Sequence, residues 1–217
     1  MNKTFTILTL ALCCSLKPAI AQNDPKAKTV LDAVSKKVNG LKTLKADFSI
    51  SLTGGKGGKV NDTKKGSATI KGQKYHVSLS GQEIICDTKT IWTYNKETKE
   101  VQVSNFNPNE QSMSPAKLLT NFYDKEYKYS YIGEKKAKGK NFDEIELSPI
   151  DKAKQVAKIE LMIDKATSLI SGGDIWQKNG NKSTYSVTNY VLNKDVPDSY
   201  FTWDSNAHPG VEVVDLR

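Results

Sequence analysis

Few residues of this 217-residue chain have the types and spacing that catalysis or metal binding requires. The two histidines, His76 and His208, have no metal-ligand spacing with each other or with Cys86. His76 falls in an alternating segment that is typical of a strand, and His208 precedes Pro209 in a predicted turn. The thiol of Cys86 lies in an apolar run without an apparent Cys–His pair, where burial is expected. We therefore interpret these three side chains as structural.

Carboxylates and glycines also lack a catalytic arrangement. Asp143, Glu144 and Glu146 stand among many lysines, so surface ion pairs are expected there rather than an acid–base pair. The glycine-rich segment 54–58 lacks the strand-to-helix context of a phosphate-binding loop, and no nucleophile elbow is present. The sequence therefore predicts a protein that is not an enzyme and that needs neither a metal nor a cofactor.

Apolar and aromatic side chains are the remaining candidates for a site, because they recur along predicted strands. The aromatic members are Phe48, Tyr75, Trp92, Tyr94, Tyr129, Tyr131, Trp176, Tyr185 and Tyr190. If these strands curl, one face of the sheet surrounds a cavity; an ordinary filled core fits the same alternation. The strand pattern by itself leaves both alternatives open.

Two helices are predicted. Asp24 as N-cap and Pro25 at the first position begin a helix that ends near Asn39 and Gly40. Its apolar stripe consists of Val30, Leu31, Val34, Val38 and Leu41. Ser114 and Pro115 begin a second, short helix between strands, which we expect to cover the sheet.

Most of the remaining chain has the period of two that predicts strands. The predicted strands are 46–52, 66–71, 74–80, 82–86, 90–95, 100–104, 127–133, 142–147, 157–164, 168–177, 182–192 and 200–202. Short turns join most of them, so neighbours in sequence are expected to pair antiparallel. A meander of this length curls toward a barrel or leaves exposed edges. We predict a single domain over residues 22–217.

The first 21 residues have the pattern of a signal peptide. Lys3 gives a positive start, residues 5–16 form an apolar stretch too short to span a bilayer, and Ala19 and Ala21 precede cleavage before Gln22. This pattern predicts export to the periplasm.

Cysteine positions leave a second interpretation of the leader open. Cys13 and Cys14 follow an apolar segment, as in a lipoprotein signal, but Leu12 is large where a small residue is required. We therefore favour soluble secretion. Cleavage would leave Cys86 as the single thiol, unable to form a disulfide within the chain.

The expected mature chain is basic. Removal of Lys3 and Lys17 leaves 30 basic and 24 acidic residues, a net charge of +6. Every basic residue except Arg217 is lysine, whereas base and phosphate recognition prefer arginine, so a nucleic-acid partner is not expected. A solvated lysine-rich surface is the simplest interpretation; the alternative is a device for approaching anionic membranes or partners.

Four segments, in order, resemble the LolA family of outer-membrane lipoprotein carriers. Residues 41–48 resemble the start of its first strand, and residues 82–95 resemble its strand, turn and W-x-Y strand, with Thr88 at the usual glycine. Residues 114–119 resemble its central helix, and residues 201–213 resemble its closing F-x-F/W and P-x-G-V-x-V segments. The ordered set covers essentially the whole expected mature chain.

The resemblance implies a mainly β fold: an incomplete, half-open antiparallel barrel of about eleven strands, with an N-terminal helix and short lid helices around an apolar cavity. It implies a monomeric periplasmic carrier for acylated lipoproteins. The client would come from an inner-membrane ABC-type transporter and pass to an outer-membrane acceptor. A lipid-sensing or regulatory module, or a carrier of another envelope lipid, is the alternative on the same scaffold.

The resemblance also assigns candidate site residues. The expected cavity lining is Leu41, Leu44, Phe48, Ile50, Tyr75, Val77, Leu79, Ile84, Trp92, Tyr94 and Trp176. The expected lid residues are Leu118, Leu119 and Phe122. Family members hold the lid closed with an arginine in the stretch that corresponds to residues 70–75. This chain has Gly72 there, which leaves Lys71 as the candidate latch.

Overall fold

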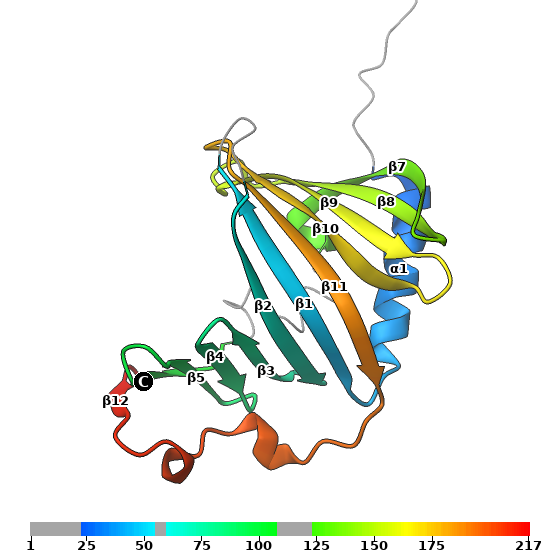
Figure 1. Cartoon of the computed structure of the whole chain (residues 1–217). Helices are drawn as coiled ribbons and strands as arrows, with labels where there is room; N and C mark the ends of the chain where they lie inside the picture. Colours follow the sequence, from blue (N-terminus) through cyan, green and yellow to red (C-terminus); the bar gives the residue numbers. More distant parts are fainter. Residues whose placement is uncertain (1–22, 55–59, 108–122) are drawn as a thin grey trace, which may run out of the picture.

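A twelve-stranded sheet dominates the computed structural model, which describes residues 23–54, 60–107 and 123–217. Across the sheet the order is β12-β6-β5-β4-β3-β2-β1-β11-β10-β9-β8-β7, and the edge strands β12 and β7 do not pair with each other. The strands are β1 (Leu44–Thr53), β2 (Val60–Lys71), β3 (Lys74–Leu79), β4 (Gln82–Cys86), β5 (Thr90–Asn95), β6 (Glu100–Asn105), β7 (Tyr127–Ala137), β8 (Lys140–Pro149), β9 (Val156–Asp164), β10 (Leu169–Gln177), β11 (Lys182–Leu192) and β12 (Glu212–Asp215). Figure 1 shows the strongly curved, half-open sheet that results. The predicted fold class is confirmed, with twelve strands rather than about eleven.

The helix α1 (Pro25–Asn39) begins and ends where the sequence predicts. One carboxylate oxygen of Asp24 accepts hydrogen bonds from the backbone nitrogens of Lys26 (2.8 Å) and Ala27 (3.4 Å). The other oxygen accepts from the backbone N–H of Tyr131 in β7 at 2.9 Å, and this bond, with the two others, lowers the pKa of Asp24. One side chain therefore both caps the helix and ties it to the edge strand.

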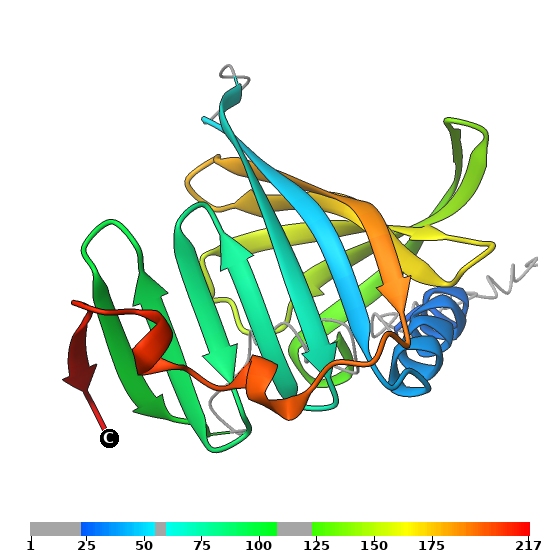
Figure 2. The ribbon, with the colours of Figure 1, turned by 60° about the horizontal axis from the view of Figure 1, so that its bottom comes forward.

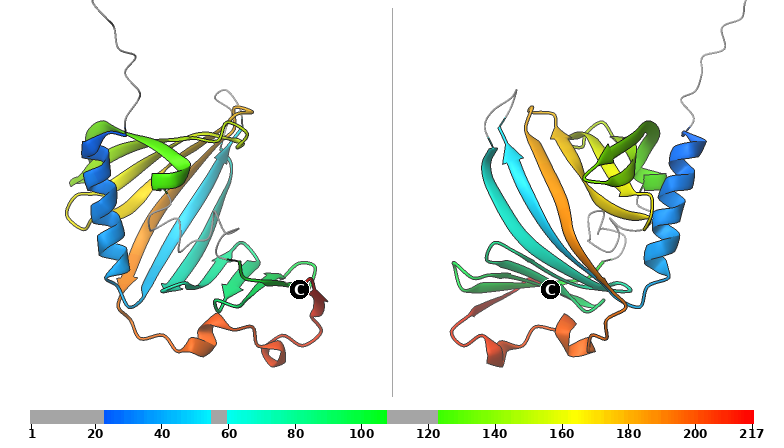
Figure 3. Two further views of the ribbon diagram at one scale, coloured as in Figure 1. Left: turned by 180° about the vertical axis from the view of Figure 1, so that it is seen from behind. Right: turned by 45° about the vertical axis from the view of Figure 1, so that its right-hand side comes forward.

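The inner face of the sheet is the face on which α1 packs. Buried Ala27, Leu31, Val34 and Val38 join one core with residues of both halves of the sheet. Figure 3 shows α1 on the concave side, beside β7–β10, and the helix contacts β7 and β10 directly. The other half of the inner face, formed by β1–β5, extends beyond the helix.

The outer face of β3–β6 has a second, smaller core. Ile85, Val101 and Val103 are buried there together with Phe201, which is fully buried, and none of the four belongs to the main core. Phe201 lies in a segment, residues 193–211, that we call the C-terminal strap. Figure 2 shows the strap, in orange to red, running along β2–β6.

The predicted strand at 200–202 is wrong, because this part of the strap forms the 3-10 helix η1 (Asp198–Phe201). Pro197 precedes it, and the backbone N–H of Tyr200 donates to the Pro197 carbonyl at 3.1 Å. A second 3-10 turn, η2 (Ser205–Ala207), follows. The strap then leads to β12, which pairs in parallel with β6 and was not predicted as a strand.

The predicted helix that begins at Ser114 lies outside the described residues. The described chain resumes with a single helical turn, α3 (Tyr123–Glu126), directly before β7. No helix among the described residues is long and apolar enough to cross a membrane.

Candidate functional site

A row of half-buried apolar side chains runs over the inner face of β1, β3, β4 and β11. We call it the inner apolar surface: Phe48, Ile50, Val77, Leu79, Ile84, Tyr185 and Val187. Strand register places these residues together. Phe48 lies opposite Val187 and Ile50 opposite Tyr185, while Val77 pairs with Ile84. An acyl chain needs such a surface, apolar and accessible at once.

Burial changes along this surface. At one end, Leu44, Ile70, Tyr75 and Cys86 are at most 5% exposed and close the core. At the other end Leu52, two residues beyond Ile50 in β1, is 45% exposed. The inner face therefore grades from a filled core into an open apolar surface, which combines the two alternatives that the sequence left open.

The expected lining residues Leu41, Leu44 and Tyr75 belong to the closed part. Leu44 and Tyr75 are each 2% exposed, and Leu41 packs against the same core. Burial raises the pKa of the Tyr75 hydroxyl and of the Cys86 thiol beside it. These groups stay protonated near neutral pH and support the floor of the inner apolar surface.

Three other expected lining residues lie on the outer face. Ile91 faces the main core, so alternation along β5 turns Trp92 and Tyr94 outward, and the Tyr94 ring lies 4.9 Å from the ring of Trp203 in the strap. Trp176 in β10 faces outward as well, with the Lys158 ammonium 4.5 Å from its ring centroid. The structure does not bring these residues to the inner apolar surface.

Tyr185 and Val187 take their place, although they were not among the expected lining residues. Their alternation in β11 was readable from the sequence. Their position was not, because it depends on the pairing of β11 with β1, two strands far apart in the chain. Gly173 in β10 lies opposite Tyr185 and has no side chain. A Cβ atom at Gly173 would lie 2.9 Å from the Tyr185 hydroxyl oxygen.

Lys71, the candidate latch, also faces outward. Its ammonium donates to the Val196 carbonyl at 2.9 Å and to the Asp198 carboxylate at 2.8 Å. Lys71 thus fastens the C-terminal strap. Leu118, Leu119 and Phe122 lie outside the described residues, so the lid stays a prediction.

The histidines have structural partners. Nε2 of His76 lies 3.0 Å from a Glu83 carboxylate oxygen, and the His76 ring lies 4.7 Å from that of Tyr200. His208, in the strap itself, stacks on Trp203 at 3.9 Å, and its ring lies 5.2 Å from that of Tyr94 in β5. Both hold the strap against the sheet. Among residues 23–54, 60–107 and 123–217, no group of three or more His, Cys, Asp or Glu could hold a metal ion.

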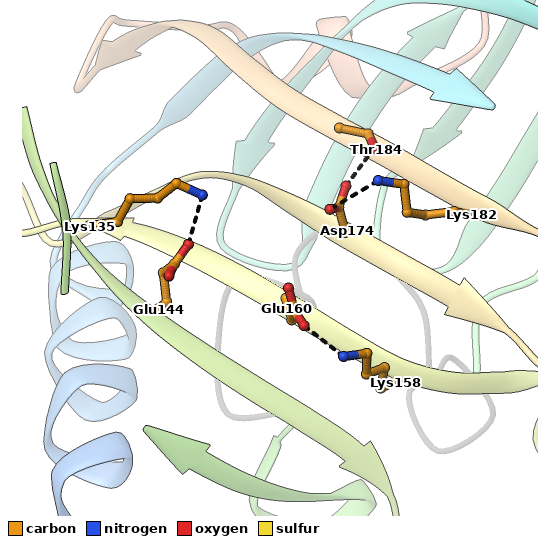
Figure 4. A network of polar contacts seen from close by, with 7 residues as sticks. All are labelled: Lys135, Glu144, Lys158, Glu160, Asp174, Lys182 and Thr184. Carbon is orange, nitrogen blue, oxygen red and sulfur yellow. Dashed lines mark hydrogen bonds and ion pairs between the residues drawn. The ribbon is translucent and has the colours of Figure 1, made fainter. Parts of the chain in front are cut away.

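A groove of about 550 Å³ crosses the outer face between the β7–β8 hairpin and β11. Gly172 and Gly173 contribute to its floor, and its walls carry both apolar and charged side chains. Figure 4 shows charged side chains in and beside these walls as pairs: Lys135 with Glu144 (3.0 Å) and Lys182 with Asp174 (3.4 Å) on neighbouring strands, and Lys158 with Glu160 (2.7 Å) within β9. A hydrogen bond to Glu160 raises the pKa of Lys158. Each carboxylate has a lysine partner, as in ordinary surface ion pairs, and the arrangement leaves no acid–base pair.

The sequence matches the model of the family described as "Outer membrane lipoprotein carrier protein LolA" over residues 39–204. No curated protein matches the chain. An uncharacterised conserved protein from Thermus thermophilus has a similar fold, with a TM-score of 0.61 at 12% identity over 88% of this chain and 99% of that one. A putative outer membrane lipoprotein-sorting protein domain from Vibrio parahaemolyticus aligns with a TM-score of 0.47 at 12% identity over 84% and 97% of the two chains.

Proposed function

This chain belongs to the LolA family of outer membrane lipoprotein carrier proteins, and we propose that it carries lipoprotein acyl chains from the inner to the outer membrane. The observation that supports this proposal is the inner apolar surface, a row of half-buried aliphatic and aromatic side chains on the concave side of an open sheet. In the proposed role, the protein works as a monomer in the periplasm after removal of residues 1–21.

The energetics of the cargo explain why such a surface is needed. An acyl chain of about fifteen methylenes costs on the order of 12 kcal/mol to expose to water, at roughly 0.8 kcal/mol per methylene. Free diffusion of a lipoprotein between membranes is therefore negligible. Contacts with the inner apolar surface would offset this cost without any chemical step.

The carrier needs partners at both ends of its route. We propose that an inner-membrane ABC-type transporter loads the acylated lipoprotein and that an outer-membrane acceptor receives it. ATP hydrolysis by the transporter would supply the free energy, so this chain would need neither nucleotide nor cofactor.

Adjacent residues on opposite faces of β3 give a direct test. Leu79 belongs to the inner apolar surface, whereas Ser78 points to the outer face. A photoreactive amino acid at position 79 should crosslink a diacylated lipopeptide, and the same residue at position 78 should not. The lipopeptide without its acyl chains serves as the control ligand and should crosslink at neither position. Equal crosslinking at both positions, or crosslinking that ignores acylation, would reject the proposed carrier role.

A further inference from the structure

One end of the sheet carries exposed apolar side chains among lysines. Ile150, which follows β8, is 48% exposed, and Leu52 near the end of β1 is 45% exposed. Trp176 near the end of β10 is half-buried. We call these three residues, with Lys152, Lys178 and Lys182, the exposed rim. In Figure 1 the ends of β1, β10 and β11 meet at the top of the sheet.

Hydrogen bonds and strand register make the rim continuous. The backbone N–H of Lys178 in the β10–β11 turn donates to the Gln155 carbonyl in the β8–β9 turn at 2.9 Å, and the Lys178 ammonium donates to the Lys152 carbonyl. Lys182 in β11 lies opposite both Trp176 and Thr53. Four strand spacings of about 4.8 Å separate β8 from β1, so the rim extends over roughly 19 Å.

The charges of the rim are unevenly balanced. Neither Lys152 nor Lys178 has a carboxylate partner among the described residues, whereas Lys182 pairs with Asp174. The nearby Asp151 carboxylate accepts a hydrogen bond from the Ala153 backbone N–H at 2.8 Å and so remains within its own turn. The rim therefore presents positive charge beside exposed apolar groups.

We propose that the exposed rim docks the protein edge-on to an anionic lipid bilayer. Ile150, Leu52 and Trp176 would enter the headgroup region, where tryptophan and aliphatic side chains are favoured, and the lysines would face lipid phosphates. Lysine suits this role because a point charge needs no fixed partner geometry. The exposed groups lie in a row along the ends of neighbouring strands. Such a row fits the flat surface of a bilayer better than it fits a protein partner whose binding requires a pocket.

The position of the rim suits this docking. Leu52 lies on the inner face two residues beyond Ile50, so the inner apolar surface continues to the rim. Trp176 flanks the same edge from the outer face. A bilayer in contact with the rim would therefore meet the open end of the inner apolar surface.

The strand β7 and its hairpin with β8 supply matched controls away from the rim. Ile132 in β7 is 49% exposed, and Lys136 and Lys138 lie in or beside the hairpin that β7 forms with β8. Ile150→Ser and Lys152→Gln/Lys178→Gln can thus be compared with Ile132→Ser and Lys136→Gln/Lys138→Gln. Each pair matches in residue type, and the controls lie away from the rim: Lys136 and Lys138 at the opposite end of the sheet, and Ile132 in the middle of β7.

The test is sedimentation of the cargo-free mature chain with vesicles of phosphatidylcholine with or without phosphatidylglycerol. We expect binding only with phosphatidylglycerol, weakened by salt. Ile150→Ser should weaken it about fivefold and Lys152→Gln/Lys178→Gln about tenfold or more, while the controls bind like the native protein.

Three results would overturn the docking proposal: no binding to vesicles, an equal loss of vesicle binding in the control variants, or binding only to membranes that contain protein. The third result would assign the rim to a protein partner. Lipopeptide affinity in solution is measured in parallel and should be unchanged in Ile150→Ser. A native protein that binds the lipopeptide but binds none of the vesicles rejects this proposal alone. A native protein that binds the vesicles but not the lipopeptide rejects only the proposed cargo.

Discussion

Gly66 in β2 shows how the absence of one side chain shapes the inner apolar surface. A Cβ atom at this position would lie 2.5 Å from the Ser78 carbonyl oxygen and 2.8 Å from Cζ of Phe48. The Phe48 ring therefore lies over Gly66. We expect Gly66→Ala to displace this ring and the β3 backbone, and to lower the free energy of unfolding by about 1–3 kcal/mol.

Gly133→Ala in β7 is the matched control, because no atom lies within 4 Å of its added Cβ. The free energy of unfolding measured in urea and the affinity for the lipopeptide should both change for Gly66→Ala. Both should hardly change for Gly133→Ala. Equal effects of the two substitutions would show that strand glycine itself, and not the room it leaves for Phe48, matters.

Asp198 in the strap allows the contribution of one ion-paired carboxylate to stability at acidic pH to be measured. Its carboxylate oxygens lie 2.8 Å from the ammonium groups of Lys71 and Lys74. Hydrogen bonds and charge from the two lysines lower the pKa of Asp198 from its ordinary value of 3.8 to about 2. Because the folded pKa is the lower one, this stabilisation is present above about pH 4 and is lost as the pH falls through about 2.

We therefore expect the urea concentration at the midpoint of unfolding to fall less steeply between about pH 4 and pH 2 in Asp198→Asn than in the native protein. Glu97→Gln, at an exposed carboxylate with no lysine partner among the described residues, should keep the native slope. An Asp198→Asn protein with the native pH dependence would mean that these ion pairs contribute nothing to folding.

At the scale of elements, the C-terminal strap stabilises the sheet without forming part of the inner apolar surface. Phe201 is fully buried against the outer face of β3–β6. Phe201→Ala should lower the free energy of unfolding by about 3–5 kcal/mol, the usual cost of truncating a buried phenylalanine. Tyr200→Ala, at a 42% exposed neighbour, should cost about 1 kcal/mol or less.

Ligand binding distinguishes this structural role from a functional one. The folded Phe201→Ala protein should bind the diacylated lipopeptide with native affinity, because the substitution lies on the other side of the sheet from Phe48 and Ile50. A weaker affinity at a temperature where the protein is fully folded would place the strap in the binding mechanism.

At the scale of the whole molecule, the proposed cargo would cover the open inner face of the sheet. A ligand that binds only the folded state at a hundred times its Kd stabilises it by about 2.7 kcal/mol, which raises the Tm of a domain of this size by about 5–10 °C. We expect this shift with the diacylated lipopeptide in calorimetry and none with its deacylated form. Leu79→Ser should reduce the shift at the same ligand concentration, whereas Ser78→Ala should retain it.

The sequence by itself determined the features that depend on nearby residues. Asp24, Pro25 and the apolar stripe specify α1, because a cap and a helical face involve residues within a few turns of each other. Alternation likewise predicted most strands and separated their two faces. The family resemblance supplied the half-open sheet, and the match over residues 39–204 confirms the family.

Only the tertiary structure decided which face of each strand is the inner one. Trp92 and Tyr94 have the composition of a ligand surface, yet the strap packs beside Tyr94 on the outer face. Ile50 meets Tyr185 through a pairing between strands at opposite ends of the chain. A period of two fixes that neighbours point in opposite directions, but which direction faces the cavity depends on the elements that fold over each side, and these come from distant parts of the sequence.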